Sequence, residues 1–379
     1  MDFNLTRDQE MIRNVVRDFA QEVIVPRATD IDRSGEFPMD IMQKLAEMDL
    51  MGLPFPEEYG GAGAGFTSYC LATEEITRAC ASTGITYEAH VSLGSKPIYL
   101  FGTEEQKQEY LSVLCRGQAM GSFGLTEPEA GSDAGGTKTT AVLEGDQWVI
   151  NGGKCFITNA SFAKFVTITA ITDKGKGKRG ISALIVPTDA PGFTIRSNYE
   201  KLGLNGSNTT ELFFDNVRIP KENLVGKEGE GFKQFLKVLD GGRVAVAAMA
   251  VGIAQASLDA SLKYAKERVQ FGRTISKFQA IQFKLADMAT HVELARLMYL
   301  KAAWLEDNGL PFGKEAAIAK LFASEIATKA ALDAIQIHGG YGYMKEFPVE
   351  RYLRDAKLLE IGEGTSEVNR LVIARHLGC

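Results

Sequence analysis

Side chains able to do acid–base chemistry stand out in one short segment near the end of the chain. Residues Ile361–Glu367 read Ile-Gly-Glu-Gly-Thr-Ser-Glu, so Glu363 stands between Gly362 and Gly364. Flanking glycines give the backbone freedom to present both a side chain and its own amide N–H. A carboxylate in this position could act as a general base, and burial would raise its pKa. Taken alone, a glutamate between glycines is more often an acidic residue of a surface loop.

A second candidate segment, Phe123–Asp133, reads Phe-Gly-Leu-Thr-Glu-Pro-Glu-Ala-Gly-Ser-Asp. Its glycines let a backbone approach a ligand closely, and the hydroxyls of Thr126 and Ser132 can hydrogen-bond a heteroaromatic ring or a phosphate. From these residues alone, a surface turn between two domains explains the segment equally well. Its chemistry therefore stays open at this point.

The usual devices for holding nucleotides and metals are missing from the sequence. No Gly-x-Gly-x-x-Gly motif follows an expected strand, and no Walker-type glycine–lysine–serine loop occurs. The four histidines are too sparse for a metal site or a Ser-His-Asp triad, and no metal site is expected. An organic cofactor would have to be held by other means.

Hydrophobic periodicity divides the chain into three expected regions. Residues 1–120 show helical spacing, with Thr6 as a helix cap, and predict an N-terminal helical domain. Residues 121–230 carry short β-rich runs separated by turn signals such as Asn151-Gly152-Gly153, and predict a compact antiparallel sandwich or barrel. Residues 231–379 predict a C-terminal four-helix bundle. The expected fold is mainly α, with a β domain between two helical regions.

Four long helices are expected in the bundle, near Phe232–Arg268, Lys277–Asn308, Lys314–His338 and Val349–His376. The first contains the longest apolar run of the chain, Val244–Ala254. This run is far shorter than the ~20 residues needed to cross a bilayer. We therefore expect a buried, alanine-rich helix and no membrane span.

Composition indicates an ordinary globular protein. The chain has 379 residues, is 45% hydrophobic and 24% charged, and carries a formal net charge of −6. The densest basic cluster, Lys174–Arg179, is spaced by glycines and is interpreted as a solvated loop tip. Nucleic-acid binding is therefore not expected.

Cysteine usage favours a reducing compartment. The five cysteines are scattered and never form a Cys-x-x-Cys pair, which argues against a disulfide framework. The N-terminal segment Met1–Leu5 lacks the charged-then-apolar pattern of a secretory signal. A cytoplasmic location is expected.

Several ordered motifs resemble those of the acyl-CoA dehydrogenase family. Thr126–Asp133 is similar to the family signature Thr-Glu-Pro-x-Ala-Gly-Ser-Asp, and Gln336–Tyr343 resembles a second signature. Arg351–Ala356 and Ile361–Glu367 follow in the expected order, so the resemblance spans essentially the whole chain. The family fold, a helical domain, a β domain and a four-helix bundle, agrees with the periodicity.

The resemblance implies FAD as the cofactor. Thr126 would lie near the flavin N5 edge, and Phe156-Ile157-Thr158 would back the isoalloxazine ring. Arg268 would reach the FAD pyrophosphate of a neighbouring subunit, because its planar donors suit phosphate oxygens. The residues implied to contact FAD are Phe123, Leu125, Thr126, Ser132, Phe156, Ile157, Thr158, Arg268, Phe271, Gln279, Gln336, Gly339, Gly340, Thr365 and Glu367.

The resemblance also implies a reaction, the α,β-dehydrogenation of an acyl-CoA to a trans-2-enoyl-CoA. Glu363 would abstract the α-proton while the β-hydride passes to flavin N5. The Glu363 amide and a ribityl hydroxyl would polarise the thioester oxygen. Some branched-chain members place the base at the position of Gly242, which cannot act here. Implied substrate contacts are Ser132, Asp240, Arg243 and Gly364.

Three departures from the family pattern bear on the pocket. Gly362 stands where many relatives have tyrosine, which predicts a wider pocket for short- to medium-chain or branched acyl groups. Phe156 stands where many have tryptophan, so it keeps a flat surface without an indole N–H. His90 lies where relatives shape the far end of the pocket, although a structural histidine explains it equally well.

Implied partners are electron-transferring flavoprotein as electron acceptor and three further copies of the chain, in a homotetramer built as a dimer of dimers. Two alternatives stay open. An acyl-CoA oxidase or other oxygen-using flavoenzyme on the same fold would react quickly with air. A non-catalytic acyl-CoA-binding protein would typically lack a glutamate at position 363.

Overall fold

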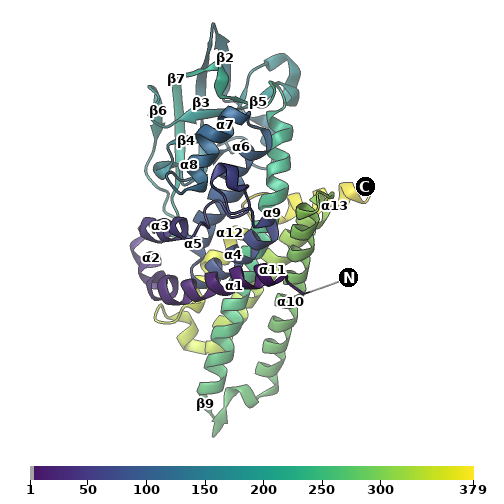
Figure 1. Ribbon diagram of the computed structural model, residues 1–379. Coiled ribbons are helices and arrows are strands. Elements are labelled where there is room, and N and C mark those ends of the chain that lie inside the picture. The colour runs from purple at the N-terminus through teal and green to yellow at the C-terminus, as the bar shows by residue number, and fades with distance from the viewer. Residues whose placement is uncertain (1–3) are drawn as a thin grey trace.

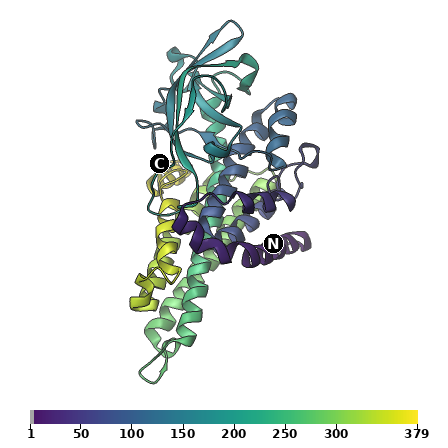
Figure 2. The same cartoon turned by 90° about the vertical axis from the view of Figure 1, so that its left-hand side faces the viewer.

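The protein is elongated, with a β-sheet at one end, short helices in the middle and long helices running to the other end (Figures 1 and 2). The computed structural model describes residues 4–379; residues 1–3, part of the N-terminal segment considered above for a targeting signal, lie outside the described residues. The expected mainly α fold with a β region between two helical regions is confirmed.

The N-terminal helices surround α4, which is buried on nearly all sides. Thr6 caps the first helix with a reciprocal capping box, as predicted. The helices are α1 (Arg7–Phe19), α2 (Ala28–Ser34), α3 (Met39–Glu47), α4 (Gly65–Ala79), α5 (Ala81–Glu88), α6 (Lys96–Phe101), α7 (Glu104–Gln106) and α8 (Ser112–Cys115). A π-helical turn, Ala89–Ser95, joins α5 to α6.

The β region is an eight-stranded sheet in the order β6-β7-β3-β2-β4-β5-β8, with β1 paired to β4. Most pairs are antiparallel, as expected, but β1 and β2 each pair with β4 in parallel. The strands are β1 (Phe123–Gly124), β2 (Thr140–Glu144), β3 (Gln147–Thr158), β4 (Phe165–Ile171), β5 (Ile181–Pro187), β6 (Phe193–Ile195), β7 (Thr209–Pro220) and β8 (Leu224–Val225).

The turn predicted at Asn151-Gly152-Gly153 is wrong. These residues continue β3, with a register shift against β7 between Ile150 and Gly152. Gly152 has φ 141°, and a Cβ there would lie 2.6 Å from Thr139 Oγ1. The glycine therefore allows close approach of a neighbouring segment inside a bulged strand, a role that turn statistics do not separate from a reversal.

The C-terminal region is built around α9 (Gly231–Glu267), whose apolar run Val244–Ala254 is buried as predicted. After a short hairpin of β9 (Val269–Gln270) and β10 (Arg273–Thr274), α10 (Gln279–Asp307) and α11 (Gly313–His338) pack against it. Helix α9 is long enough, and over one stretch apolar enough, to cross a membrane. Of that apolar stretch, 78% is buried inside the protein.

The fourth expected helix, Val349–His376, is not continuous. It is two helices, α12 (Val349–Leu359) and α13 (Ser366–His376), separated by a turn at residues 360–365. The interruption contains two glycines and Glu363 with φ 54°, a backbone conformation that cannot continue a helix. The break creates the turn that carries Glu363.

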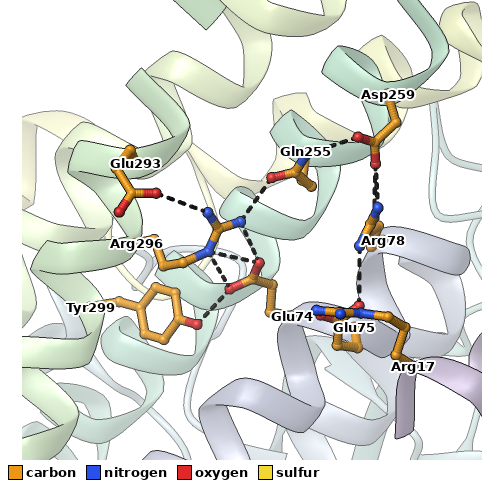
Figure 3. A network of polar contacts seen from close by, with 9 residues as sticks. All are labelled: Arg17, Glu74, Glu75, Arg78, Gln255, Asp259, Glu293, Arg296 and Tyr299. Atoms are coloured by element: carbon orange, nitrogen blue, oxygen red, sulfur yellow. Dashed lines mark hydrogen bonds and ion pairs between the residues drawn. The ribbon is translucent and has the colours of Figure 1, made fainter. Parts of the chain in front are cut away.

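One hydrophobic core runs through both helical regions, while the sheet has a smaller core of its own. A polar network joins α4 to α9 and α10 across the first core (Figure 3). Glu74 accepts from Arg296 at 2.7 Å and from the Tyr299 hydroxyl at 2.5 Å. Arg78 pairs with Asp259 at 2.6 Å. These contacts help to hold the helical regions together behind the candidate site.

Candidate active site

Glu363 occupies a tight turn with a strained backbone. Gly362 N–H donates to Leu358 O at 2.8 Å, which ends α12, and Gly364 follows with φ 98°. A left-handed conformation at a residue with a side chain costs on the order of 1 kcal/mol or more. Within residues 4–379, the amide N–H of Glu363 donates to no other group. The turn thus presents a carboxylate and a free donor from one residue.

The Glu363 side chain points at α9, where Gly242 makes room for it. Both carboxyl oxygens are buried. A Cβ added to Gly242 would lie 1.9 Å from Glu363 Oε2. The position of the alternative family base, Gly242, and the position of Glu363 therefore face the same space, and only one of them can carry a side chain.

The turn is held by contacts to the carbonyl of Gly364. That oxygen accepts from Lys320 Nζ at 2.7 Å and from Asn369 Nδ2 at 2.9 Å. Thr365 caps α13 by accepting from Val368 N–H at 3.2 Å. Burial lowers the pKa of Lys320 to about 8, an effect opposed by the nearby Glu363 carboxylate. Sequence reasoning missed Lys320 and Asn369, although a lysine on the buried alanine face of a helix is a signal of such a role.

Asp240 and Arg243 lie next to this turn, as the resemblance implied. Their side chains form an ion pair of 2.6 Å on α9, with Arg243 buried. Arg243 Nε has no partner within the described residues, and Nη2 lies 3.8 Å from the Cβ that Gly364 would carry. The structure brings Glu363, Gly364, Asp240 and Arg243 together.

Burial is the largest influence on the protonation of Glu363. Desolvation raises the pKa of Glu363 to about 7, while the carboxyl of Glu88 and the charges of Lys320 and Arg243 act in the opposite direction. Glu88, at the end of α5, is itself fully buried, and desolvation followed by the charge of Glu363 raises its pKa well above the usual range. Glu88 was also missed from the sequence, because no local pattern marks it.

The two halves of the implied flavin-ring site lie together in the β region. Cys155 N–H donates to Thr126 O at 2.9 Å, and Ser122 Oγ donates to Thr158 O at 2.7 Å. Phe156, at a register shift of β3, has φ 59° and an exposed ring. An exposed aromatic ring at an irregular point of a strand suits a flat heteroaromatic ring.

A buried ion pair shapes this segment. Glu127 binds Lys154 Nζ at 2.7 Å and accepts from Lys138 N–H at 2.6 Å and from Thr139 N–H at 3.1 Å. Although desolvation opposes it, these contacts lower the pKa of Glu127 to about 2. Glu127, the glutamate of the signature Thr126–Asp133, therefore holds this loop in place through its hydrogen bonds and ion pair. Ser132 lies on the exposed part of that loop.

Three of the remaining implied FAD contacts, Arg268, Gly339 and Gly340, lie at the far end of α9. Arg268, Gly339 and Gly340 line one open cavity of about 450 Å³ with Tyr264 and His338, whose rings stack 4.2 Å apart. No atom lies within 4 Å of the Cβ that either glycine would carry. An arginine beside bare backbone suits a pyrophosphate. Four other implied contacts, Phe271, Gln279, Gln336 and Glu367, are at least partly exposed at the surface.

These two groups of implied contacts are far apart within one chain. The sheet packs near the start of α9 and Arg268 follows its end, and the 37-residue helix is about 55 Å long at ~1.5 Å per residue. Figure 1 shows the sheet and the β9 hairpin at opposite ends of the molecule. The residues at each place suit a different part of an FAD molecule, and most of the length of α9 separates the two places.

His90 is buried and neutral rather than poised for chemistry. Its Nδ1 accepts from Gly121 N–H at 2.8 Å, which ties the helical region to the start of the β region. Burial lowers the pKa of the imidazole to about 4. The structure thus favours the structural interpretation of this residue.

Comparison with known proteins identifies the family. Models of the acyl-CoA dehydrogenase N-terminal, middle and C-terminal domains match residues 6–118, 122–217 and 229–378. The chain is 64% identical to a probable acyl-CoA dehydrogenase, YngJ, of Bacillus subtilis, with all of both chains covered. It is 50% identical to the short-chain specific acyl-CoA dehydrogenase of Clostridium acetobutylicum, covering 99% of each. Butyryl-CoA dehydrogenase from Megasphaera elsdenii superposes with a TM-score of 0.98 at 45% identity over both full chains.

The chain therefore belongs to the acyl-CoA dehydrogenase family, and it is an FAD-dependent oxidoreductase that acts on acyl-CoA.

Proposed function

We propose that the protein converts short- to medium-chain acyl-CoA, straight or branched, to trans-2-enoyl-CoA, with Glu363 as the base. The observation that carries the proposal is the buried carboxyl of Glu363 facing α9, on a turn whose amide N–H is free within the described residues. FAD bound by the β region supplies the acceptor for the β-hydride.

The turn performs two tasks in this scheme. The Glu363 carboxylate takes the α-proton, and burial makes the carboxylate a stronger base than one in water. The amide N–H of the same residue donates to the thioester oxygen, where negative charge develops as the proton leaves. Lys320 and Asn369 hold the Gly364 carbonyl, so that both groups are preorganised. Closing the site against water strengthens each contact.

The space beside the base supports the substrate range. Among non-neighbouring heavy atoms of the described residues, only Leu358 O and Cγ lie within 4 Å of the Cβ that Gly362 would carry, at 3.6 and 3.9 Å. A relative with a large side chain there would fill this space, whereas Gly362 leaves it to the acyl group. The names of two relatives, short-chain specific and butyryl-CoA dehydrogenase, point to the same range.

Assembly and electron transfer complete the proposal. The residues implied to contact the flavin ring and those at the Arg268 cavity lie far apart within one chain. They can therefore contact one FAD only if they come from different chains, and a homotetramer would place the Arg268 cavity of one chain beside the β region of another. We propose that electron-transferring flavoprotein accepts the electrons. We also propose that the protein is located in the cytoplasm. Support for these points is the family membership and the sequence pattern.

Anaerobic titration of the purified holoenzyme with a panel of straight and branched acyl-CoAs tests the function. We expect C4–C8 substrates to bleach the flavin absorbance, and Glu363→Gln to slow bleaching by at least ~10³-fold while still binding acyl-CoA, because an amide cannot accept the proton. Undiminished bleaching by the variant would contradict the assignment of the base.

The same preparation separates a dehydrogenase from an oxidase. We expect slow formation of hydrogen peroxide in air and fast reduction of electron-transferring flavoprotein or a dye. Failure on every C4–C8 substrate would reject the proposed substrate range, and peroxide formation as fast as dye reduction would favour the oxygen-using alternative.

A further inference from the structure

A second pocket lies outside the candidate active site, where three segments that are distant in the sequence meet. Its volume is about 400 Å³, and it is lined by α2, by the segment 201–205 before β7, and by the start of α12 with the residues just before it. It shares no lining residue with the cavity at Arg268. None of its lining residues is implied to contact FAD or acyl-CoA, so the pocket is separate from the site of the reaction.

The acidic side chains of this pocket are already engaged within the protein. Asp32 pairs with Arg354 at 2.6 Å, and Glu350 pairs with the same arginine at 2.7 Å. Asp32 also accepts from Asn205 Nδ2 at 2.9 Å. Among the described residues, no other acid lines the pocket. The two carboxylates therefore hold α2 against α12 and leave the other cations of the pocket unpaired.

Four cationic side chains line the same pocket without an ion-pair partner in residues 4–379: Arg33, Lys201, Lys345 and Arg351. Lys201 is partly buried and donates to Ser207 O at 2.8 Å. Arg33 and Lys345 are exposed. With Arg354 included, the lining carries five positive and two negative charges, although the whole chain has a net charge of −6. This local excess of positive charge favours an anionic ligand.

Arg351 is the residue that points most directly to a ligand. It is only 8% exposed, yet within the described part of the chain its guanidinium donates one hydrogen bond, from Nη1 to Thr29 Oγ1 at 3.1 Å. Asp355 follows one turn later on α12, but its carboxylate accepts from Leu204 N–H at 2.6 Å and forms no ion pair. Buried arginines are rarely found without a paired carboxylate. Arg351 therefore has donors left for a group in the pocket that it lines.

We propose that this pocket binds a phosphate-bearing small molecule of nucleotide size, a function separate from the acyl-CoA reaction. A phosphate monoester carries close to two negative charges at neutral pH, which suits several unpaired cations better than a single carboxylate does. The planar donors of Arg351 also match phosphate oxygens.

The size and lining of the pocket support a ligand larger than phosphate itself. Pockets for small molecules have volumes of about 300–1,000 Å³, and this one lies within that range. Leu202, Phe347 and Pro348 add apolar surface to the lining, against which a sugar or a base can pack. We therefore expect the phosphate to lie at the cations and the remainder of the ligand at these apolar side chains.

Calorimetric titration of the FAD-loaded holoenzyme with AMP, inorganic phosphate and adenosine tests the chemistry of the ligand. We expect AMP to bind saturably, phosphate to bind more weakly, and adenosine, which lacks the phosphate, not to bind. Binding of AMP should weaken as the salt concentration rises, because exposed cations are screened. Adenosine binding as tightly as AMP would contradict recognition of a phosphate.

Three variants locate the binding. Arg351→Gln should weaken AMP binding by ~10-fold or more, because it removes hydrogen bonds to a charged group. Lys345→Gln changes an exposed side chain, so it leaves folding intact, and should weaken AMP binding by about 3-fold. Lys174→Gln is the matched control: it removes the same charge from the exposed loop 174–179, outside the pocket, and should leave the affinity unchanged. Thermal unfolding shows whether Arg351→Gln is folded, and Lys345→Gln decides the matter if it is not.

The proposal is overturned if the holoenzyme shows no saturable binding of AMP. It is also overturned if the affinity for AMP is unaffected by Arg351→Gln and Lys345→Gln, since the ligand then binds elsewhere, or if Lys174→Gln weakens binding equally, since only net charge then matters. None of these titrations requires turnover, so a failure of the proposed acyl-CoA reaction would leave their outcome unchanged.

Discussion

At the residue scale, Glu363 combines two unfavourable features that the surrounding packing stabilises. Its backbone has φ 54°, and its carboxyl is buried among groups that only partly compensate for lost water. Backbone strain and desolvation of this kind are concentrated at functional sites. Both features serve the same end, because the turn aims the carboxyl and burial makes it a stronger base.

The contact with Gly242 gives a sharp prediction. Gly242→Ala places a methyl group 1.9 Å from the present position of Glu363 Oε2, so the carboxyl must move. We expect kcat/KM to fall by ~10²-fold or more, since misplacement of about 1 Å is enough for such a loss. Stability should be unchanged or higher by up to about 1 kcal/mol, because alanine is the better helix former.

Steady-state kinetics and thermal unfolding of Gly242→Ala check both parts of this prediction. The substitution Gly242→Glu alone should not supply a working base, because its side chain would enter the space that Glu363 fills. The double variant Gly242→Glu with Glu363→Gly empties that space and is therefore the informative companion. Full activity in Gly242→Ala would mean that the base lies elsewhere during turnover.

At the element scale, α9 is the helix against which the other parts are placed. It packs on α4, α10 and α11, reaches the sheet at its start, and faces the Glu363 side chain at Gly242. The network of Figure 3 fixes α4 and α10 against it. Since α4 is followed directly by α5, which ends at Glu88, the same network indirectly places one side of the candidate site.

Breaking this network from one side should be costly. Arg296→Met leaves Glu74, which is 4% exposed, buried with only the Tyr299 hydroxyl as a partner among the described residues. We expect a loss of about 3–5 kcal/mol in the free energy of unfolding, and a smaller loss in the double variant Glu74→Gln with Arg296→Met. Chemical denaturation measures both.

An exposed ion pair provides the control for that prediction. Lys138 and Glu129 also form an ion pair, but their side chains are 70% and 69% exposed. Lys138→Met should cost no more than about 1 kcal/mol, because solvent screens the pair. Equal losses for Lys138→Met and Arg296→Met would show that burial does not decide the strength of these contacts.

At the scale of the whole molecule, the arrangement predicts a site shared between chains. The cavity at Arg268 and the base at Glu363 lie about 26 helical residues of α9 apart, or roughly 39 Å at 1.5 Å per residue, counted from Gly242 to Arg268. The exposed ring of Phe271 beside the cavity, 93% accessible, is typical of a surface covered in an assembly.

Complementation between two inactive variants tests this sharing. Arg268→Ala should lose FAD and Glu363→Gln should lose proton transfer, so each alone is inactive. In a randomly mixed assembly, about a quarter of the sites combine an intact Glu363 with an intact Arg268 from the partner, and activity should return to that level. Light scattering should show four chains.

If mixed assemblies of four chains recover no activity, Arg268 and Glu363 contribute to the site from the same chain. A control mixture of Glu363→Gln with Gly242→Ala, both of which alter the same side of the site, should recover nothing.

The sequence by itself determined the class of each region and predicted Glu363 as the base. Helical and β periodicities report which residues face a core, and they were sufficient for the three regions and for the buried run Val244–Ala254. The motif around Glu363 was sufficient for the proposed base, since its role depends on residues adjacent in the chain.

Only the tertiary structure decided how the site is completed. The break between α12 and α13 and the continuous course of β3 through Gly152 depend on contacts with distant segments, which local spacing does not encode. Glu88 lies far from Glu363 in sequence, and nothing local distinguishes it from a surface acid. Its burial, which raises its pKa well above the usual range, exists only after the helices pack.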